Sequence, residues 1–127
     1  MGVAFIWIGL AAAAVAATSA SAQQAGSATV GEALYDAKCG GCHSVDANRI
    51  GPRHRDVVGR KVASVPDFDY SDGLRKLGGV WTLARLDTWL QNPPVMAPGA
   101  KMFLTVPDPR QRHDIVAYLA SVSKPAK

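Results

Sequence analysis

The sequence predicts an all-α protein in which three or four helices are joined by long loops. Three separated segments carry apolar residues at helical spacing, and no segment of useful length alternates as a half-buried β-strand does. Glycine and proline breakers are frequent between those segments, which favours irregular loops. The chain has no internal repeats, so we predict a single folded domain.

The N-terminal part of the chain has the pattern of a secretory signal. Residues 1–30 contain no charged side chain, and an apolar run ends in the small-residue cleavage pattern Ala20-x-Ala22. An uncleaved membrane anchor is the alternative, because no Lys or Arg precedes the apolar run. We therefore predict a signal peptide, a flexible lead, one folded domain and a C-terminal tail over residues 1–22, 23–30, 31–123 and 124–127.

The charged residues all follow residue 30 and give the chain a formal charge of +4. They are spread along the sequence, whereas nucleic-acid binding needs a dense basic face. We expect no nucleic-acid partner. A moderate positive charge is compatible with attraction to an acidic protein partner.

The first predicted helix covers residues 31–38 and the second covers residues 82–91. Their apolar positions lie three or four residues apart, at Ala33, Leu34 and Ala37 and at Leu83, Leu86 and Leu90. Thr82 is a suitable N-cap for the second helix, and the prolines that follow Asn92 end it.

The last predicted helix starts at Pro109, with Asp108 as its N-cap, and ends before Pro125. Its apolar face contains Ile115, Tyr118 or Leu119, and Val122. Residues 44–80 and the proline-rich stretch that leads to Pro109 are predicted to be loops. Irregular runs of this length inside a compact domain need an explanation, and wrapping around a cofactor would be one.

Cys39 and Cys42 are the two cysteines of the chain, and His43 follows directly. A disulfide between these cysteines would close too small a loop to stabilise the fold much. A thioredoxin-like redox dithiol is expected beside a βαβ unit, and the sequence shows none. A zinc site needs four ligands, whereas this segment offers at most three and no second Cys or His pair follows at a suitable spacing. Covalent haem attachment fits best, because two thiols can bond the haem vinyl groups while the adjacent histidine ligates the iron. We therefore predict one haem c, bonded through Cys39 and Cys42.

Haem iron has a second axial position, and the chain offers four candidates for it: Met96, Met102, His54 and His113. The chain between His43 and Met102 is long enough to cross to the opposite face of a haem. Met96 is close enough in sequence to remain a rival.

Further motifs, in order along the chain, resemble those of class I cytochromes c, the soluble electron carriers of mitochondria and bacteria. After Cys-Gly-Gly-Cys-His come Ile50-Gly51-Pro52, Gly59-Arg60-Lys61, Phe68-Asp69-Tyr70-Ser71-Asp72, Trp81, Leu90-Gln91-Asn92-Pro93, Pro98-Gly99-Ala100-Lys101-Met102 and Asp114-Ile115-Val116-Ala117-Tyr118-Leu119. This resemblance covers residues 31–121. It implies a cytochrome c-like fold with three to four helices and long loops wrapped around one covalent haem.

The resemblance also implies a role for individual residues. Pro52 would accept a hydrogen bond from His43, the proximal ligand, and Met102 would be the sixth ligand. Haem propionates would be contacted by Arg60, Tyr70, Ser71 and Trp81. Gly31 and Tyr35 would pack against the last helix, and the two histidines that are not ligands, His54 and His113, are expected at solvated positions.

Several residues depart from the family pattern, namely Leu74, Trp89, Ala100 and Leu104. They make the methionine side of the pocket drier, so the family's reduction potential is not carried over. Pro94 and Val95 stand where a lysine pair is common, which leaves Lys38 and Lys101 as candidate docking charges.

The implied function is one-electron transfer between respiratory or photosynthetic partners, without enzymatic activity, because both axial positions on the iron would be filled. Redox proteins would dock transiently at the haem edge near Lys38 and Lys101, and we expect a monomer. Cleavage of the signal would leave a periplasmic protein with no stable membrane association. The alternatives are a dedicated subunit of a periplasmic dehydrogenase, and a haem enzyme or sensor with a displaceable sixth ligand.

Overall fold

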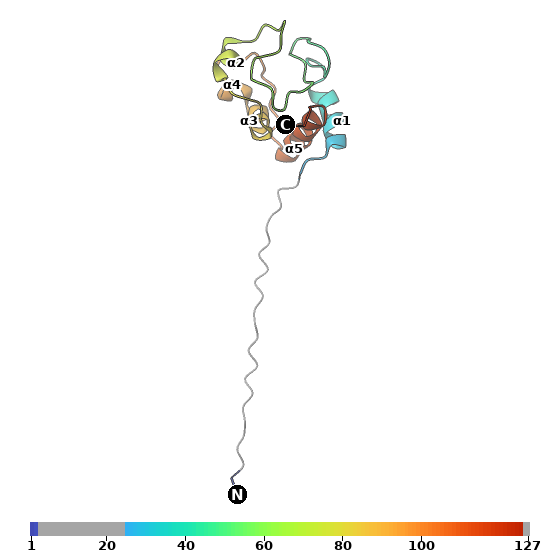
Figure 1. Ribbon diagram of the computed structural model, residues 1–127, viewed down its shortest axis with the longest axis vertical. Helices are drawn as coiled ribbons and strands as arrows, with labels where there is room; N and C mark the ends of the chain where they lie inside the picture. Colours follow the sequence, from blue (N-terminus) through green and yellow to red (C-terminus); the bar gives the residue numbers. More distant parts are fainter. Residues whose placement is uncertain (3–24, 126–127) are drawn as a thin grey trace.

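The computed structural model describes residues 1–2 and 25–125, so the predicted signal peptide lies almost wholly outside the described residues. The described part folds into α1 (Ala28–Lys38), α2 (Asp72–Leu77), α3 (Leu83–Gln91), α4 (Pro93–Met96) and α5 (Pro109–Ser121) (Figure 1). Extended pairing within residues 25–125 is limited to one isolated bridge between Lys61 and Val80. The predicted all-α class is confirmed.

The first helix begins earlier than predicted. Ser27 is its N-cap, and the Ser27 hydroxyl accepts a hydrogen bond from the backbone N–H of Val30. Residues 28–30 are therefore helical, although the sequence placed them in the flexible lead. The helix ends at Lys38, so the two cysteines lie immediately after its last turn.

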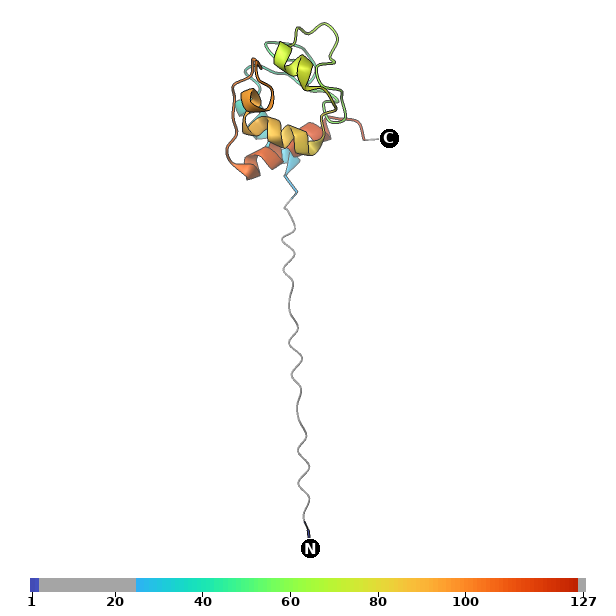
Figure 2. The same ribbon diagram turned by 90° about the vertical axis from the view of Figure 1, so that its left-hand side faces the viewer.

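Helices α1 and α5 pack against each other at one side of the molecule (Figures 1 and 2). Gly31 lies at their contact, where an added Cβ would overlap the carbonyl group of Asp114 and come within 2.9 Å of the Tyr118 Cβ. One turn later, the rings of Tyr35 and Tyr118 lie 5.1 Å apart. Gly31 and Tyr35 thus pack against the last helix, as the sequence predicted.

The caps predicted for the later helices are confirmed. The Thr82 hydroxyl accepts from the backbone N–H of Arg85 at the start of α3, and the Asp108 carboxylate accepts from that of Arg110 at the start of α5. Leu83 was expected on the buried face of α3, but it is exposed; the buried residues of this helix are Leu86, Trp89 and Leu90.

Two short helices interrupt stretches that the sequence predicted as loops. Ser71 caps α2 by accepting from the backbone N–H of Leu74, and Gly78, with φ of 63°, ends it. The sequence predicts a helix break at Gly73, but this residue lies inside α2. A glycine is required at this position because a Cβ would overlap the carbonyl oxygen of Pro98. Helix α4 starts at Pro93, whose fixed φ suits a first helical position.

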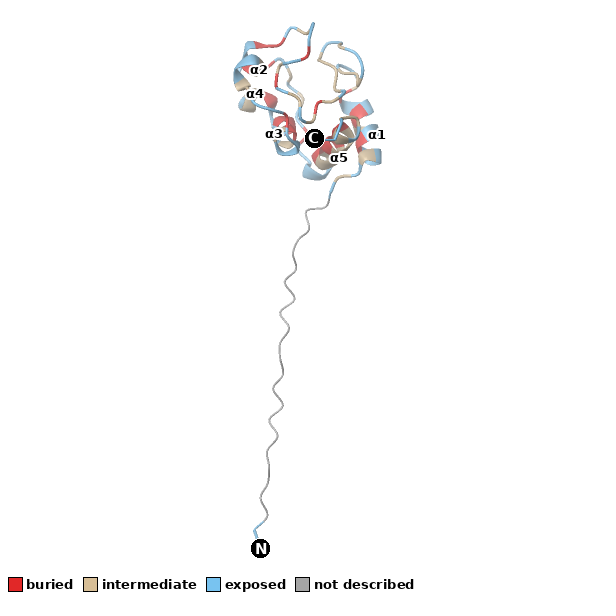
Figure 3. Ribbon diagram, viewed as in Figure 1, coloured by how far each residue is buried: buried red, intermediate tan, exposed pale blue. Residues whose placement is uncertain are grey.

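The interior side of the helices and loops carries the buried residues (Figure 3). Ile115 and Leu119 of α5 contribute to this core, with Leu86 and Leu90 of α3. Arg112 is also buried on α5, and its guanidinium donates to the Asp87 carboxylate at 2.9 Å and to the carbonyl of Val106. Arg112 thus links α5 to Asp87 of α3 and to Val106 of the loop that carries Met102.

Candidate haem-binding site

A cavity of about 750 Å³ lies between the helices and the long loops. Every site residue predicted from the sequence lines it: Cys39, Cys42, His43, Pro52, Arg60, Tyr70, Ser71, Trp81 and Met102. Two of the rivals for the second axial position, Met96 and His113, are not among the lining residues. The fold therefore brings the predicted set together from segments far apart in the sequence.

The two cysteines are both unpaired, so the described structure contains no disulfide between them. Cys39 is buried, and Cys42 is exposed at the cavity. Burial raises the pKa of the Cys39 thiol to about 11, although Lys38 acts in the opposite direction. Backbone N–H groups of Cys42 and His43 donate to the Cys39 carbonyl at 3.1 and 2.9 Å, which holds the three residues in one tight turn.

The imidazole of His43 is oriented by its backbone neighbours. Its Nδ1 lies 2.9 Å from the Pro52 carbonyl oxygen, to which it donates in the tautomer that leaves Nε2 free. Burial lowers the pKa of His43, which favours the neutral ring that a metal ligand requires. Gly51 approaches the same ring so closely that a Cβ would overlap it.

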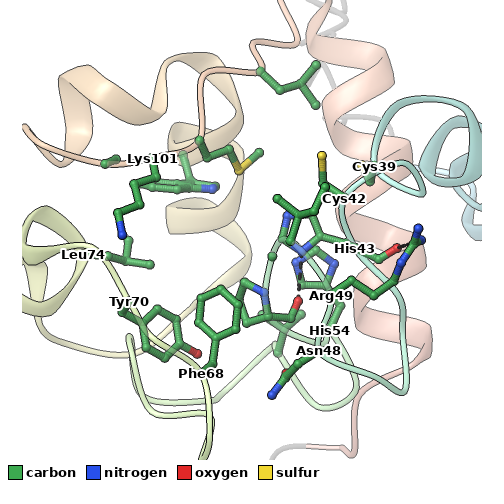
Figure 4. A pocket seen from close by; sticks show the side chains of 18 of the residues that line it. Cys39, Cys42, His43, Asn48, Arg49, His54, Phe68, Tyr70, Leu74 and Lys101 are labelled. Carbon is green, nitrogen blue, oxygen red and sulfur yellow. Dashed lines mark hydrogen bonds between the residues drawn. The ribbon is translucent and has the colours of Figure 1, made fainter.

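Residues around Met102 lie across the cavity from His43. Figure 4 shows Cys42 and His43 on one side, and Lys101 and Leu74 on the other. Met102 itself is half-buried, on the loop between α4 and α5. An imidazole and a thioether that line one cavity are a donor set suited to haem iron.

The polar lining fits the carboxylates of a haem. Arg60 donates from its two Nη atoms to the carbonyls of Arg53 and Arg55, each at 3.0 Å. Its Nε is the one buried side-chain nitrogen or oxygen without a partner among the described residues, and burial lowers the pKa of this guanidinium. A buried N–H of this kind is costly unless a ligand accepts from it, and a propionate carboxylate would do so.

Two hydroxyls that line the same cavity as Arg60 also retain a hydrogen to donate. The Tyr70 hydroxyl accepts from the backbone N–H of Val65 at 3.1 Å, and the Ser71 hydroxyl accepts from Leu74 as the cap of α2. Trp81 is buried edge-on to Trp89, with ring centroids 5.5 Å apart. The residues present therefore fit a covalently attached haem.

The expectation that His54 is solvated is wrong. Its ring stacks on that of His43, with centroids 4.1 Å apart and planes 18° apart, and its Nδ1 lies 2.9 Å from the Tyr35 hydroxyl oxygen. His113 is half-buried on α5, with Nε2 3.9 Å from the Asp87 carboxylate. The loop that contains His54 has no periodicity, so the sequence offers no signal for the direction of its side chain.

Sequence reasoning missed Arg49 at the mouth of the cavity. Its guanidinium donates to the carbonyls of Gly40 and His43 and so stabilises the cysteine turn. Ile50 and Phe103 are 79% and 75% exposed, although both line the cavity. Ile50 belongs to the Ile50-Gly51-Pro52 motif and Phe103 directly follows Met102, so both were adjacent to motifs that the sequence showed.

Comparisons with known proteins identify the family of the chain. The cytochrome c family model matches residues 28–123. Cytochrome c2 of Rhodomicrobium vannielii is 40% identical over 107 residues, which are 81% of this chain and 85% of that protein. Cytochrome c-type cyt cy of Rhodobacter capsulatus is 37% identical, and the match covers 78% of this chain and 51% of that protein.

A solved structure, cytochrome cH from Methylobacterium extorquens, aligns with a TM-score of 0.72 and 39% identity. The alignment covers 76% of this chain and 99% of that one. The family match, the fold and the covalent haem c motif at Cys39, Cys42 and His43 agree, and the chain belongs to the cytochrome c family.

Proposed function

We propose that this chain is a periplasmic electron carrier whose haem c is bonded to Cys39 and Cys42 and ligated by His43 and Met102. The observation that supports this most strongly is that both thiols, the imidazole and the thioether line one cavity, while Met96 and His113 do not. Relatives that bear the names cytochrome c2 and cytochrome cH support the same function.

The chain's own residues have two tasks in this proposal. Pro52 holds the Nδ1 hydrogen of His43, which keeps Nε2 available as a ligand. Leu86, Leu90, Ile115 and Leu119 form an apolar wall that excludes water. A haem held by His43 and Met102 would supply one-electron exchange between Fe(III) and Fe(II), and a neutral thioether ligand would favour Fe(II). Because His43 and Met102 would both ligate the iron, no ligand position would remain for a substrate, and we propose no enzymatic activity.

The mouth of the cavity would be the docking surface for redox partners. Its exposed residues combine apolar Ile50 and Phe103 with the basic residues Lys38, Arg49 and Lys101 and the acidic residues Asp67 and Asp69. Such a rim, which combines exposed apolar side chains with a weakly positive overall charge, suits a small transient interface.

Export is proposed from the sequence, because the signal pattern over residues 1–22 precedes the folded domain. No helix in the described residues is long and apolar enough to cross a membrane. A dedicated subunit of a dehydrogenase is a second candidate, favoured by the exposed apolar pair Ile50 and Phe103, which a permanent partner would bury. Size exclusion of the native protein separates the two, since a free carrier elutes as a monomer.

Mass spectrometry of the exported protein tests the proposal. We expect the mass of a chain that starts near Gln23 with one haem added, and no alkylatable thiol. A redox titration of the same protein should follow a one-electron curve. A chain without haem, with two alkylatable thiols, would contradict it.

A further inference from the structure

Two side chains behind His43 form a connected pair that the electron-carrier function does not by itself require. His54 lies parallel to His43 at 4.1 Å between centroids, and the ring of Tyr35 meets His54 at 68°, with centroids 5.6 Å apart. The Tyr35 hydroxyl oxygen is 2.9 Å from His54 Nδ1. Figure 4 shows the His43 and His54 rings next to each other at the cavity.

The Tyr35 hydroxyl and the His54 imidazole share one hydrogen bond, and the tautomer of the ring decides which of the two groups donates. Either tautomer keeps Nδ1 beside the hydroxyl, so the contact fixes the position of the His54 ring in both cases.

The hydrogen bond from His43 to Pro52 leaves one motion of the ligand ring unrestrained. A single bond at Nδ1 fixes the position of that atom, but it permits the ring to rotate about the line that joins Nδ1 to the Pro52 oxygen. A flat ring stacked against one face of His43 opposes this rotation. An aliphatic side chain in the place of His54 would fill the space without presenting a flat face, and it would leave the Tyr35 hydroxyl without its hydrogen-bond partner.

We propose that Tyr35 and His54 are a positioning pair that sets the plane of the proximal imidazole, with His54 acting on His43 by stacking and Tyr35 holding His54 by its hydroxyl. The inference rests on the proposed ligation by His43. Tyr35 belongs to α1 and packs on Tyr118 of α5, so the pair connects the orientation of the ligand to the contact between the two terminal helices. Groups that orient a metal-ligating histidine commonly tune the metal, and the pair would act here in addition to the carbonyl of Pro52.

The test uses ferric holoprotein of His54→Leu, Tyr35→Phe and the double variant. The readout is the order and spread of the haem-methyl proton resonances, which depend on the orientation of the axial ligand planes. Two matched controls remove the same groups elsewhere: Tyr118→Phe deletes a neighbouring phenolic hydroxyl, and His113→Leu deletes the other histidine that is not a proposed ligand.

We expect His54→Leu to change the order or spread of the methyl resonances. Tyr35→Phe should change them in the same sense but less, and the double variant should match His54→Leu, because the hydroxyl acts through the imidazole. Both controls should retain the original pattern. If His54→Leu does not retain haem, Tyr35→Phe decides, since it preserves the ring.

Variants that retain haem and show the original methyl pattern would overturn the inference, as would a double variant in which the two effects simply add. The same spectra report on the proposed ligation independently, through the strongly shifted methyl resonance of an iron-bound methionine. Its absence from the unmodified protein would contradict the proposed function, whereas its presence beside an unchanged methyl pattern contradicts the positioning pair alone.

Discussion

The backbone of Gly51 lies against the imidazole of His43, so that an added Cβ would be 2.5 Å from Nδ1 and 2.6 Å from Nε2. The residue before Pro52 must therefore lack a side chain for the ring to keep its hydrogen bond to the Pro52 carbonyl. Substituting Gly51 thus disturbs the ligand directly.

Gly51→Ala should displace the His43 ring and lower the yield of haem-containing protein, with a loss of stability of about 1–3 kcal/mol from overpacking. The measurement is the ratio of haem absorbance to protein, together with the melting temperature. Gly41→Ala is the control, because no protein atom lies within 4 Å of a Cβ at that position. Equal haem content in the two variants would show that the close approach is unimportant.

The helices that were predicted correctly have local signals. Thr82 and Asp108 precede periodic apolar runs, and each caps its helix in the structure. Helix α2 has a cap residue, Ser71, but no periodic apolar run follows it, because Gly73 lies inside this short helix and Gly78 ends it. The packing of Gly73 against Pro98 is a tertiary contact. Local pattern therefore predicts the framework better than the loops.

The site was predictable where motifs are short and ordered. Cys39, Cys42 and His43 were predicted from their spacing and Met102 from the family resemblance, and all four line the cavity. His54 was misplaced because nothing in an irregular loop distinguishes an inward side chain from an outward one. Arg112 carried a usable signal, since it shares the spacing of Ile115 and Leu119 on the buried face of α5.

Arg112→Ala should destabilise the fold by about 2–3 kcal/mol, because it leaves Asp87 and two backbone carbonyls without their donor. The side chains of Arg112 and Asp87 are 11% and 24% exposed, so some solvent screening reduces the loss. Denaturant unfolding of the holoprotein measures the change. Arg110→Ala, at an exposed site two residues earlier on α5, should leave the midpoint almost unchanged.

Gly31→Ala should separate α1 from α5, because the added methyl group meets the backbone of Asp114 and the Cβ of Tyr118. Overpacking of this kind costs about 1–3 kcal/mol, and each kcal/mol lowers the melting temperature of a domain of this size by roughly 4–8 °C. Thermal unfolding of the holoprotein is the measurement. Ala33→Ser, at an exposed position on the same helix, serves as the control; an equal melting temperature for both variants would contradict the close contact.

Lys38→Glu and Lys101→Glu should slow association with an acidic redox partner, since both lysines are exposed at the mouth of the cavity. The effect should be largest at low ionic strength and fade as salt screens the charges. Stopped-flow electron transfer across a salt series measures it. Lys61→Glu changes the same charge away from the cavity, and an equal effect from this variant would contradict docking at the mouth.

The methionine-to-iron charge-transfer band of the ferric protein tests the central claim most directly, namely that His43 and Met102 ligate one haem bound in the cavity. Met102 lines the cavity and Met96 does not. We predict that the band is present in the unmodified protein, lost in Met102→Ala and retained in Met96→Ala. A band that survives Met102→Ala, or disappears in Met96→Ala alone, would contradict this account.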